Sequence, residues 1–189
     1  MNQVMSFFSK LIPPSRKGHK NFERGRAAEL RADYSKAEAY FTTAAEAFDA
    51  HLTLLETEGE EARPSHLVMA GICYTRTGRF EDALRVLDAC IERKKIPDAF
   101  LNAGYAAAKL GLADRTVAYW QAYPDWAGQR VIANTLTDLV KAIRKQENPD
   151  LQGACEAVAL AVAKQDKTNQ RDRRFRDRGH KHSEFRQGY

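Results

Sequence analysis

The sequence contains few residues that interrupt helices, with 11 glycines and 6 prolines among 189 residues. This scarcity suits a helical protein better than a turn-rich sheet. No apolar run approaches the roughly 18–20 residues that a membrane-spanning helix needs, so we do not expect an integral membrane protein. The first residues, MNQVMSFFSKLIPP, lack the long apolar region and small-residue cleavage site of a signal peptide, and we therefore expect a cytoplasmic protein.

Cysteine is also scarce. Cys73, Cys90 and Cys155 are an odd-numbered set without close spacing. Each lies within an apolar helical pattern, where a free cysteine behaves as a small hydrophobic residue. We predict buried thiols rather than a disulfide, in a reducing compartment.

The sequence lacks the motifs that would indicate an enzyme. It has no P-loop, no dinucleotide-binding fingerprint and no HExxH zinc motif. His19, His51 and His66 are isolated along the chain, and His180 and His182 form an HKH sequence in the tail, where a metal site would need other ligands. We therefore expect no catalytic residues, no metal site and no cofactor.

Positive charge is concentrated at the two ends of the chain. Residues 1–20 contain four basic side chains and no acidic one, and residues 167–189 contain eight basic and three acidic side chains. The net charge of +5 therefore leaves −4 for residues 21–166. The basic balance indicates basic arms on a mildly acidic body and is no evidence for a nucleic-acid-binding fold.

Three segments of the chain align with one another. They begin at a glycine and read GRAAELRADYSKAEAYFTTAA, GICYTRTGRFEDALRVLDACI and GYAAAKLGLADRTVAYWQAY, from Gly25, Gly71 and Gly104. A small residue follows twelve positions after each glycine, at Ala37, Ala83 and Thr116. A large apolar residue follows sixteen positions after it, at Phe41, Leu87 and Trp120. Such internal periodicity is the signature of a repeat protein.

This pattern resembles the tetratricopeptide-repeat (TPR) family over residues 18–124. The resemblance implies an all-α, right-handed superhelix of about three helix pairs, in which the glycine lets the two helices of a pair approach closely. We expect repeats at 18–63, 64–96 and 97–124, with the second helix of the first repeat continuing to about Glu56. Pro64 and Pro97 should begin helices, and Gly78 and Gly111 should adopt left-handed turns within the pairs.

The segments on either side of the repeats carry weaker signals. Two apolar stripes of helical spacing, separated by Asn148-Pro149-Asp150, predict a capping helix pair or degenerate fourth repeat at 125–165. The charge-dense tail 166–189 has few large apolar residues and is predicted to be disordered. The spacing of apolar residues in 1–17 indicates a short amphipathic helix ended by Pro13-Pro14. It would pack on the first repeat, on a partner or on a membrane.

The resemblance also implies a binding surface. In TPR proteins the concave face is lined by the first helix of each pair, at positions two before, one after and five after the glycine. Carried over position by position, these are Glu23, Arg26, Leu30, Met69, Ile72, Arg76, Asn102, Tyr105 and Lys109. Arg76 and Lys109 would suit an acidic or C-terminal peptide, and Met69 and Ile72 would supply apolar pockets. The alternative is that Leu30, Met69 and Ile72 belong to the core.

Three functions fit these observations. The first is a non-enzymatic adaptor that binds a peptide or helix of another protein in the concave groove. The family's clamp for chaperone tails is not reproduced, because only Asn102 matches it and Asp98 stands where a lysine is needed. The second is a nucleic-acid- or ribonucleoprotein-associated factor. The third and weaker one is a membrane-peripheral assembly factor attached through residues 1–17.

The second function depends on the arginine-rich tail. Phe175 and Phe185 are interleaved with arginines that would contact phosphates or anionic lipid. The arginines are Arg171, Arg173, Arg174, Arg176 and Arg178. The alternative is a solubilising tail without a ligand, since Asp172 and Asp177 dilute its charge.

Overall fold

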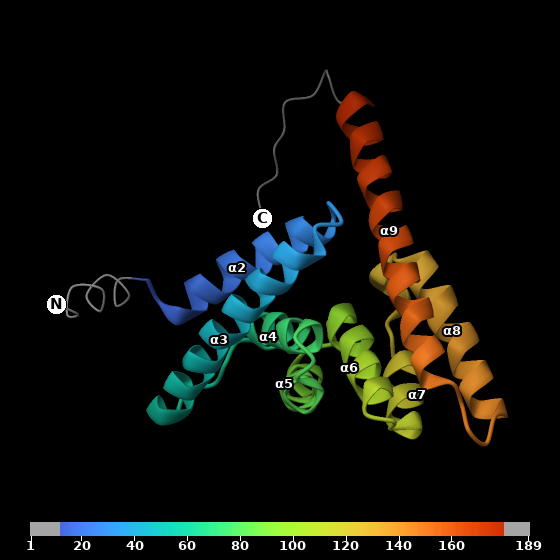
Figure 1. Cartoon of the computed structure of the whole chain (residues 1–189), viewed down its shortest axis with the longest axis horizontal. Helices are drawn as coiled ribbons and strands as arrows, with labels where there is room; N and C mark the ends of the chain where they lie inside the picture. Colours follow the sequence, from blue (N-terminus) through green and yellow to red (C-terminus); the bar gives the residue numbers. More distant parts are fainter. Residues whose placement is uncertain (1–11, 180–189) are drawn as a thin grey trace.

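The computed structural model describes residues 12–179 of the chain (Figure 1). Every regular element in this range is a helix, which confirms the predicted all-α fold class. The α-helices are α2 (Pro14–Glu29), α3 (Tyr34–Glu58), α4 (Pro64–Arg76), α5 (Phe80–Arg93), α6 (Pro97–Lys109), α7 (Ala113–Gln121), α8 (Arg130–Lys145) and α9 (Leu151–Gly179). A turn of 3-10 helix, η1 (Asp125–Ala127), connects α7 to α8. None of the described helices combines the length and apolarity needed to cross a membrane.

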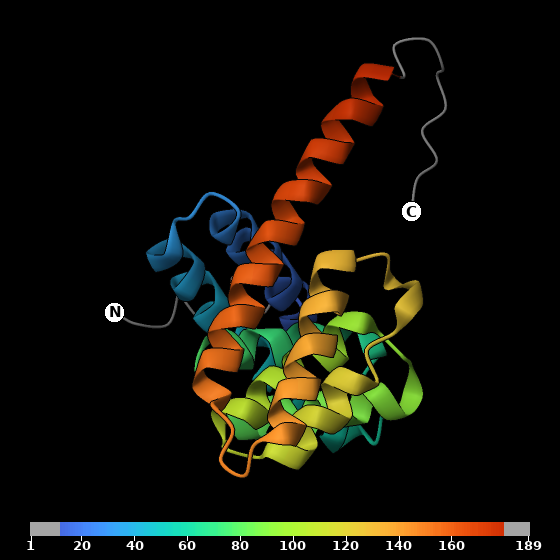
Figure 2. The same cartoon turned by 90° about the vertical axis from the view of Figure 1, so that its right-hand side faces the viewer.

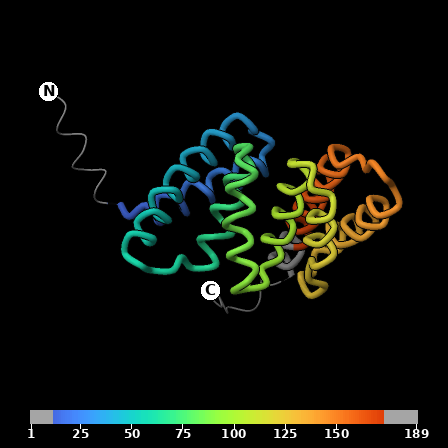
Figure 3. Tube along the Cα trace, turned by 90° about the horizontal axis from the view of Figure 1, so that it is seen from below, coloured from blue at the N-terminus to red at the C-terminus, as the bar shows by residue number. Residues whose placement is uncertain are grey.

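Consecutive helices pack as pairs, and the pairs follow one another along the molecule in chain order (Figures 1 and 3). The turn within each of the first three pairs contains one residue with a positive φ, at the same place in the repeat. These are Ala32 at 58°, Gly78 at 76° and Gly111 at 75°. The left-handed turns predicted at Gly78 and Gly111 are confirmed, and in the first pair an alanine takes the conformation that is cheap only for glycine.

The repeat glycines lie where two helices of a pair touch. A Cβ atom added to Gly25 would lie 2.8 Å from Phe41 Cε1, and one added to Gly71 would lie 2.4 Å from Leu87 Cγ. At Gly104 it would lie 2.2 Å from the Trp120 ring. Each glycine therefore faces the large residue sixteen positions later, and the close approach needs the missing side chain.

Three helices of the stack begin at a proline, and two of these starts confirm sequence predictions. Pro64 and Pro97 stand in the first turn of α4 and α6, as predicted. Pro14 begins α2 in the same way. A proline is tolerated at this position because the N–H it lacks would have no partner within the helix. The amphipathic helix predicted to end at Pro13-Pro14, and its docking, concern residues 1–11, which lie outside the described residues.

The second helix of the first pair is extended, as predicted. It continues to Glu58, slightly beyond the expected end, and Gly59 closes it in the left-handed conformation with a φ of 69°. The loop of residues 60–63 then leads to α4. The additional turns of α3 place His51 beside His66 at the start of α4.

The apolar core forms two adjoining clusters. The first includes Phe41, Phe48, Tyr74 and Leu87, which are at most 1% exposed, and joins the first two pairs to part of α6. The second joins α6 and α7 to α8 and α9, and its members include Trp120, Leu136, Val140, Cys155 and Val158. α8 and α9 thus bury the apolar side of the third pair, at the place where the sequence predicts a capping pair or a degenerate fourth repeat.

The length of α9 differs from the sequence prediction. The sequence predicts disorder from residue 166, but α9 continues to Gly179, and its last part projects beyond the helix pairs (Figures 1 and 2). Two side chains around the predicted boundary bind the start of α8. Gln165 is 5% exposed, and its Oε1 accepts a hydrogen bond from the Val131 amide at 2.9 Å. Asn169 Nδ2 donates to Gln129 Oε1 at 3.1 Å.

Candidate functional site

The predicted concave surface lies along α2, α4 and α6, and three of its residues meet in one polar network. Glu29, at the end of α2, holds two arginines at once. Its Oε2 accepts from Arg26 Nη1 at 2.6 Å, and its Oε1 accepts from Arg76 Nε at 2.6 Å. Arg76 Nη1 also donates to Asn102 Oδ1 at 3.4 Å. The network therefore links the first helices of three successive pairs, and we name Arg26, Glu29, Arg76 and Asn102 the concave network.

Local geometry explains why these side chains converge. Arg26 and Glu29 are three residues apart on α2, so they share one helix face. Arg76 is the last residue of α4, and its side chain reaches Glu29 at the end of α2. The amide of Asn102 is fixed by its own helix, because Nδ2 donates to the Asp98 backbone oxygen at 2.8 Å. The side chains of Arg26 and Arg76 remain 31% and 28% exposed, so the network is open to solvent.

The last helix reaches this surface. Asp166 Oδ2 on α9 lies 3.5 Å from Arg26 Nη2, which connects the first described helix to the last. At the start of α9, Gln152 Oε1 accepts a hydrogen bond from Lys109 Nζ at 2.7 Å. Cys155 Sγ donates to the Tyr105 backbone oxygen at 3.8 Å. Helix α9 thus contacts the part of the predicted groove that lies on α6. The part that lies on α2 and α4 is next to α9.

The remaining predicted groove residues have different surroundings. Ile72 is 6% exposed and belongs to the first core cluster, and Met69 packs against that cluster. These two residues therefore belong with the core, which is the alternative given in the sequence analysis. Leu30 is 47% exposed at the end of α2. Glu23 is exposed, and its Oε1 lies 3.4 Å from Nε2 of His19.

The charges in the groove are balanced rather than uniformly positive. Burial disfavours the charged form of Arg26, but the attraction of Glu29 and Asp166 outweighs it and raises the pKa of the guanidinium. The Asp98 side chain is exposed at the surface. Desolvation by the surrounding helices nevertheless raises the pKa of its carboxyl, and the positive charges of Arg26 and Arg76 oppose this rise. The two arginines therefore lie among three carboxylates, and a ligand must match a mixed surface.

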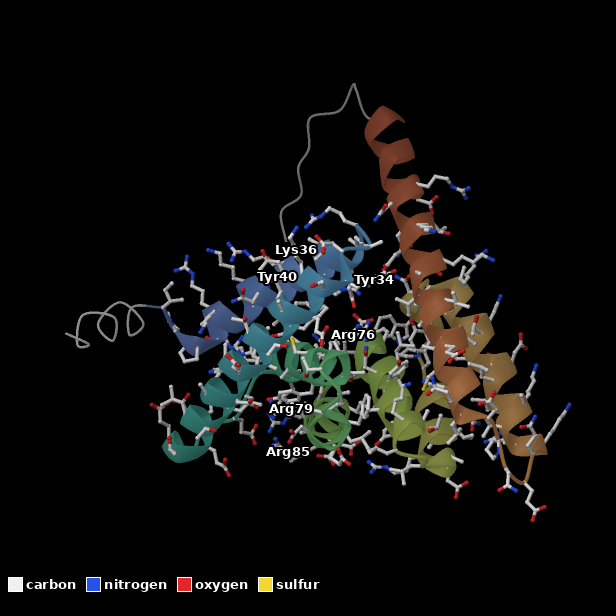
Figure 4. The ribbon with its side chains drawn as sticks, in the orientation of Figure 1. Tyr34, Lys36, Tyr40, Arg76, Arg79 and Arg85 are labelled. Atoms are coloured by element: carbon white, nitrogen blue, oxygen red, sulfur yellow. The ribbon has the colours of Figure 1, made fainter. Side chains whose placement is uncertain are left out.

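The opposite side of the stack carries a second polar cluster. Asp49 on α3 accepts from Arg79 Nη1 at 2.6 Å and from the Tyr74 hydroxyl at 2.7 Å. Arg79 stands at the start of α5 and also pairs with Asp82 at 2.7 Å. Figure 4 shows Arg76 on the upper side of the stack and Arg79 and Arg85 on the lower side. Because Arg79 is held by two carboxylates and lies 4.4 Å from the Tyr74 ring centre, this cluster fixes the first pair to the second.

The structure also brings together two residues that sequence reasoning treated as isolated. His51 Nε2 on α3 and His66 Nδ1 on α4 are 2.9 Å apart. The two histidines are fifteen residues apart in the sequence. The extension of α3 places them side by side, and no sequence motif indicates this contact. Among the side chains that the structure describes, residues 12–172, no group of three histidine, cysteine, aspartate or glutamate side chains converges as a metal site would require.

The cysteines carry no sign of reactivity. Cys73, Cys90 and Cys155 are free and buried, as predicted. Burial raises the pKa of the Cys73 thiol to about 12 and that of Cys155 to about 11, so both remain protonated at neutral pH. A thiol in this form is a poor nucleophile.

A shallow depression of about 520 Å³ lies away from the concave network, between α7 and the end of α8. Its lining includes Asp114, Val117, Gln121, Arg144 and Glu147. None of the predicted site residues borders it. Its mixed lining, with polar side chains spread around the rim, offers no convergent set of groups that would hold a small molecule.

The arginine-rich tail lies in and beyond the projecting part of α9. Arg171 is exposed on this helix. Arg173, Arg174, Arg176 and Arg178 follow within the same helix, where the structure describes the backbone alone. His180, His182 and Phe185 lie outside the described residues.

Comparison with known proteins gives no match from which a function could be argued. No model of a known protein family matches the chain. Searches of curated proteins and of solved structures likewise give no match. The fold and the concave network are therefore the observations from which a function can be argued.

Proposed function

We propose that this protein is a TPR-like, non-enzymatic scaffold of the cytoplasm that binds a peptide or helix of another protein. The binding surface is the concave side beside α2 and α4. The observation that carries the proposal is the concave network, in which Arg26, Glu29, Arg76 and Asn102 from three successive pairs meet while remaining partly exposed. The TPR resemblance is supported by the contacts of Gly25, Gly71 and Gly104 with the residues sixteen positions later.

The ligand we propose presents a carboxylate to Arg26. Of the two acidic contacts of Arg26, the one to Glu29 is 2.6 Å and the one to Asp166 is 3.5 Å. A partner carboxylate can therefore replace Asp166 without breaking the short pairs within the network. Charge-assisted contacts of arginine with carboxylates provide both orientation and affinity. The neighbouring Leu30, which is 47% exposed, offers an apolar contact beside the charged one.

The test is affinity purification from native lysate with charge-neutral variants. Arg26→Gln and Arg76→Gln remove a positive charge in the network and keep a polar side chain. The matched control is Arg85→Gln, which removes the same charge on the opposite side, where the Arg85 side chain is 66% exposed. We expect Arg26→Gln and Arg76→Gln to lose a partner that the wild type and Arg85→Gln retain. Equal recovery by all four proteins, each confirmed as folded by circular dichroism, contradicts the proposed surface.

A second candidate function is binding of nucleic acid by the last helix. It is favoured by the continuation of α9 to Gly179 as a projecting helix with Arg171 exposed. A helix that presents several arginines to phosphates releases counterions, so the association constant should fall steeply with salt concentration.

Fluorescence anisotropy with a labelled single-stranded RNA measures that dependence. A variant ending at Gln170 is the right comparison, because it keeps the Gln165 and Asn169 contacts with α8. We expect salt-dependent binding by the full chain and none by the shortened one. Binding that is insensitive to salt, or equal in both proteins, excludes this candidate.

A further inference from the structure

The histidine pair between α3 and α4 has the geometry of a small chelating site. His51 Nε2 and His66 Nδ1 are 2.9 Å apart, and the ring centres are 4.8 Å apart with the rings inclined at 72°. Both side chains are half-buried, and the ring of Phe48 packs beside His66. The two nitrogens come from different helices, so a group bound by both would connect α3 directly to α4.

Both imidazoles favour the uncharged form that a metal ion requires. Burial lowers the pKa of His51, and burial together with the positive charges of His51, Arg63 and His19 lowers that of His66. In the neutral pair one ring nitrogen donates its proton to the lone pair of the other. If the donating ring moves its proton to its outer nitrogen, both facing nitrogens carry a free lone pair and no net proton is released.

We propose that His51 and His66 form a two-histidine site for a late first-row divalent cation, with Ni²⁺ and Cu²⁺ preferred over Zn²⁺. Bonds of about 2.0–2.1 Å from two nitrogens 2.9 Å apart to one metal ion enclose an angle of roughly 90°. This is the angle between neighbouring ligands in square-planar and octahedral complexes, which suit Cu²⁺ and Ni²⁺. A tetrahedral Zn²⁺ ion would need the nitrogens to separate by roughly 0.4 Å.

The site is completed by water and requires a modest rearrangement. Each ring must turn so that its lone pair points at the ion rather than at the other nitrogen. Histidine χ2 is a broad torsion, so such a turn is inexpensive. Arg63 and His19 place positive charge near His66 and oppose the cation, which limits the affinity. Protonation of either imidazole competes with the metal, so binding should weaken as the pH falls below about 6.5.

Isothermal titration calorimetry of the full chain with NiCl₂ at pH 7.5 tests the proposal. The variants are His51→Gln and His66→Gln. Two controls separate the pair from other histidines. His19→Gln changes the exposed histidine on α2, and the double variant His180→Gln/His182→Gln removes the HKH sequence of the tail. We expect one Ni²⁺ per chain in the wild type and in both controls, and a loss of affinity of about tenfold or more in His51→Gln and His66→Gln.

A second measurement covers the case in which a pair variant does not fold. Electron paramagnetic resonance of the wild-type chain with one equivalent of Cu²⁺ reports the number of equatorial imidazole nitrogens, and we expect two. The tail variant should keep this spectrum. The proposal is overturned if the wild type binds no Ni²⁺, if binding persists in both pair variants, or if the tail variant loses the two-nitrogen spectrum. Failure of this proposal leaves the concave surface untouched, because the pair lies outside the concave network.

Discussion

At the repeat glycines, an added methyl group would overlap a buried side chain of the neighbouring helix. A Cβ at Gly104 would lie 2.2 Å from Trp120, whose ring is 2% exposed and whose Nε1 donates to the Leu101 backbone oxygen at 3.3 Å. The ring is thus fixed on several sides and cannot move away. Overpacking of this kind outweighs the helix propensity that alanine gains over glycine.

We therefore predict that Gly104→Ala lowers the free energy of unfolding by about 2–3 kcal/mol. Gly153→Ala is the comparison, because its Cβ meets the exposed Asp150 carboxylate, which can move at the cost of the hydrogen bond it accepts from the Gly153 amide, about 1 kcal/mol. Urea denaturation followed by circular dichroism measures both. A control that loses as much as Gly104→Ala would show that the close approach to Trp120 is not the cause.

A second residue-scale prediction concerns the turn of the first pair. Ala32 has a φ of 58°, a conformation that Gly78 and Gly111 adopt in the later pairs. The left-handed conformation costs alanine about 1–2 kcal/mol, of which glycine recovers part. We expect Ala32→Gly to raise the free energy of unfolding by about 0.5–1 kcal/mol. Gly78→Ala should lower it by a similar amount, since nothing lies within 4 Å of the added Cβ. Thermal unfolding of the two variants gives both signs.

The last helix, α9, contributes a helix cap to the neighbouring helix α8. The Val131 amide at the start of α8 lacks a partner within its own helix, and Gln165 from α9 accepts its hydrogen bond. We predict that Gln165→Ala costs about 1 kcal/mol of stability, as the loss of a helix cap does. Lys164→Ala, on the exposed side of α9, should be nearly neutral. Chemical denaturation distinguishes them, and equal effects would contradict the capping role.

The contact between α3 and α4 should make the fold sensitive to mild acid. Burial lowers the pKa of His51 and His66 below the usual value of 6.5, so the folded chain binds fewer protons than the unfolded one. Unfolding then takes up protons, and the free energy of unfolding falls as the pH decreases through and below 6.5. We expect a lower urea midpoint at pH 5.5 than at pH 7.5. The difference should shrink in His51→Gln/His66→Gln, and an unchanged difference would exclude the pair as its source.

At the scale of elements, sequence patterns predicted the contacts, helix starts and turns that depend on residue spacing within one repeat. Gly71 and Leu87 lie in one continuous segment, and so do the proline starts and the glycine turns. Contacts that depend on the path of a distant helix had no such signal. Asp166 is one charged residue among many in α9, and its approach to Arg26 follows from how the last pair folds back. The prediction that the last helix ends near residue 165 is wrong, because Gln165 and Asn169 make contacts with α8 that composition does not reveal.

The candidate site was predictable to the same degree. The positions of Arg26, Arg76 and Asn102 follow from the repeat, whereas Glu29, which joins the two arginines, was not singled out. Tyr105 and Lys109 were placed on the right helix, but their contacts with α9 depend on side chains far along the chain. The histidine pair arises from the extended α3, whose extra turns bring His51 level with His66.

At the scale of the whole molecule, α9 divides into a packed part and a projecting part. Leu151 to Gln165 packs on α6 and α8, whereas the end of the helix stands clear of the other pairs (Figure 2). A helix without tertiary contacts is marginally stable in water. We predict that hydrogen exchange followed by mass spectrometry finds fast exchange beyond residue 170 and slow exchange before 165. Equal protection along α9 would mean that the projecting end is covered, for instance by a second copy.

The contact of Asp166 with Arg26 has a consequence for how this architecture can change over evolutionary time. An open stack lengthens by duplicating a repeat, because each unit touches only its neighbours. Here a duplicated pair inserted between α2 and α9 would move them apart by about 10 Å, the usual distance between packed helices. Asp166 would no longer reach Arg26. The return of the last helix to the first therefore ties the molecule to its present number of repeats.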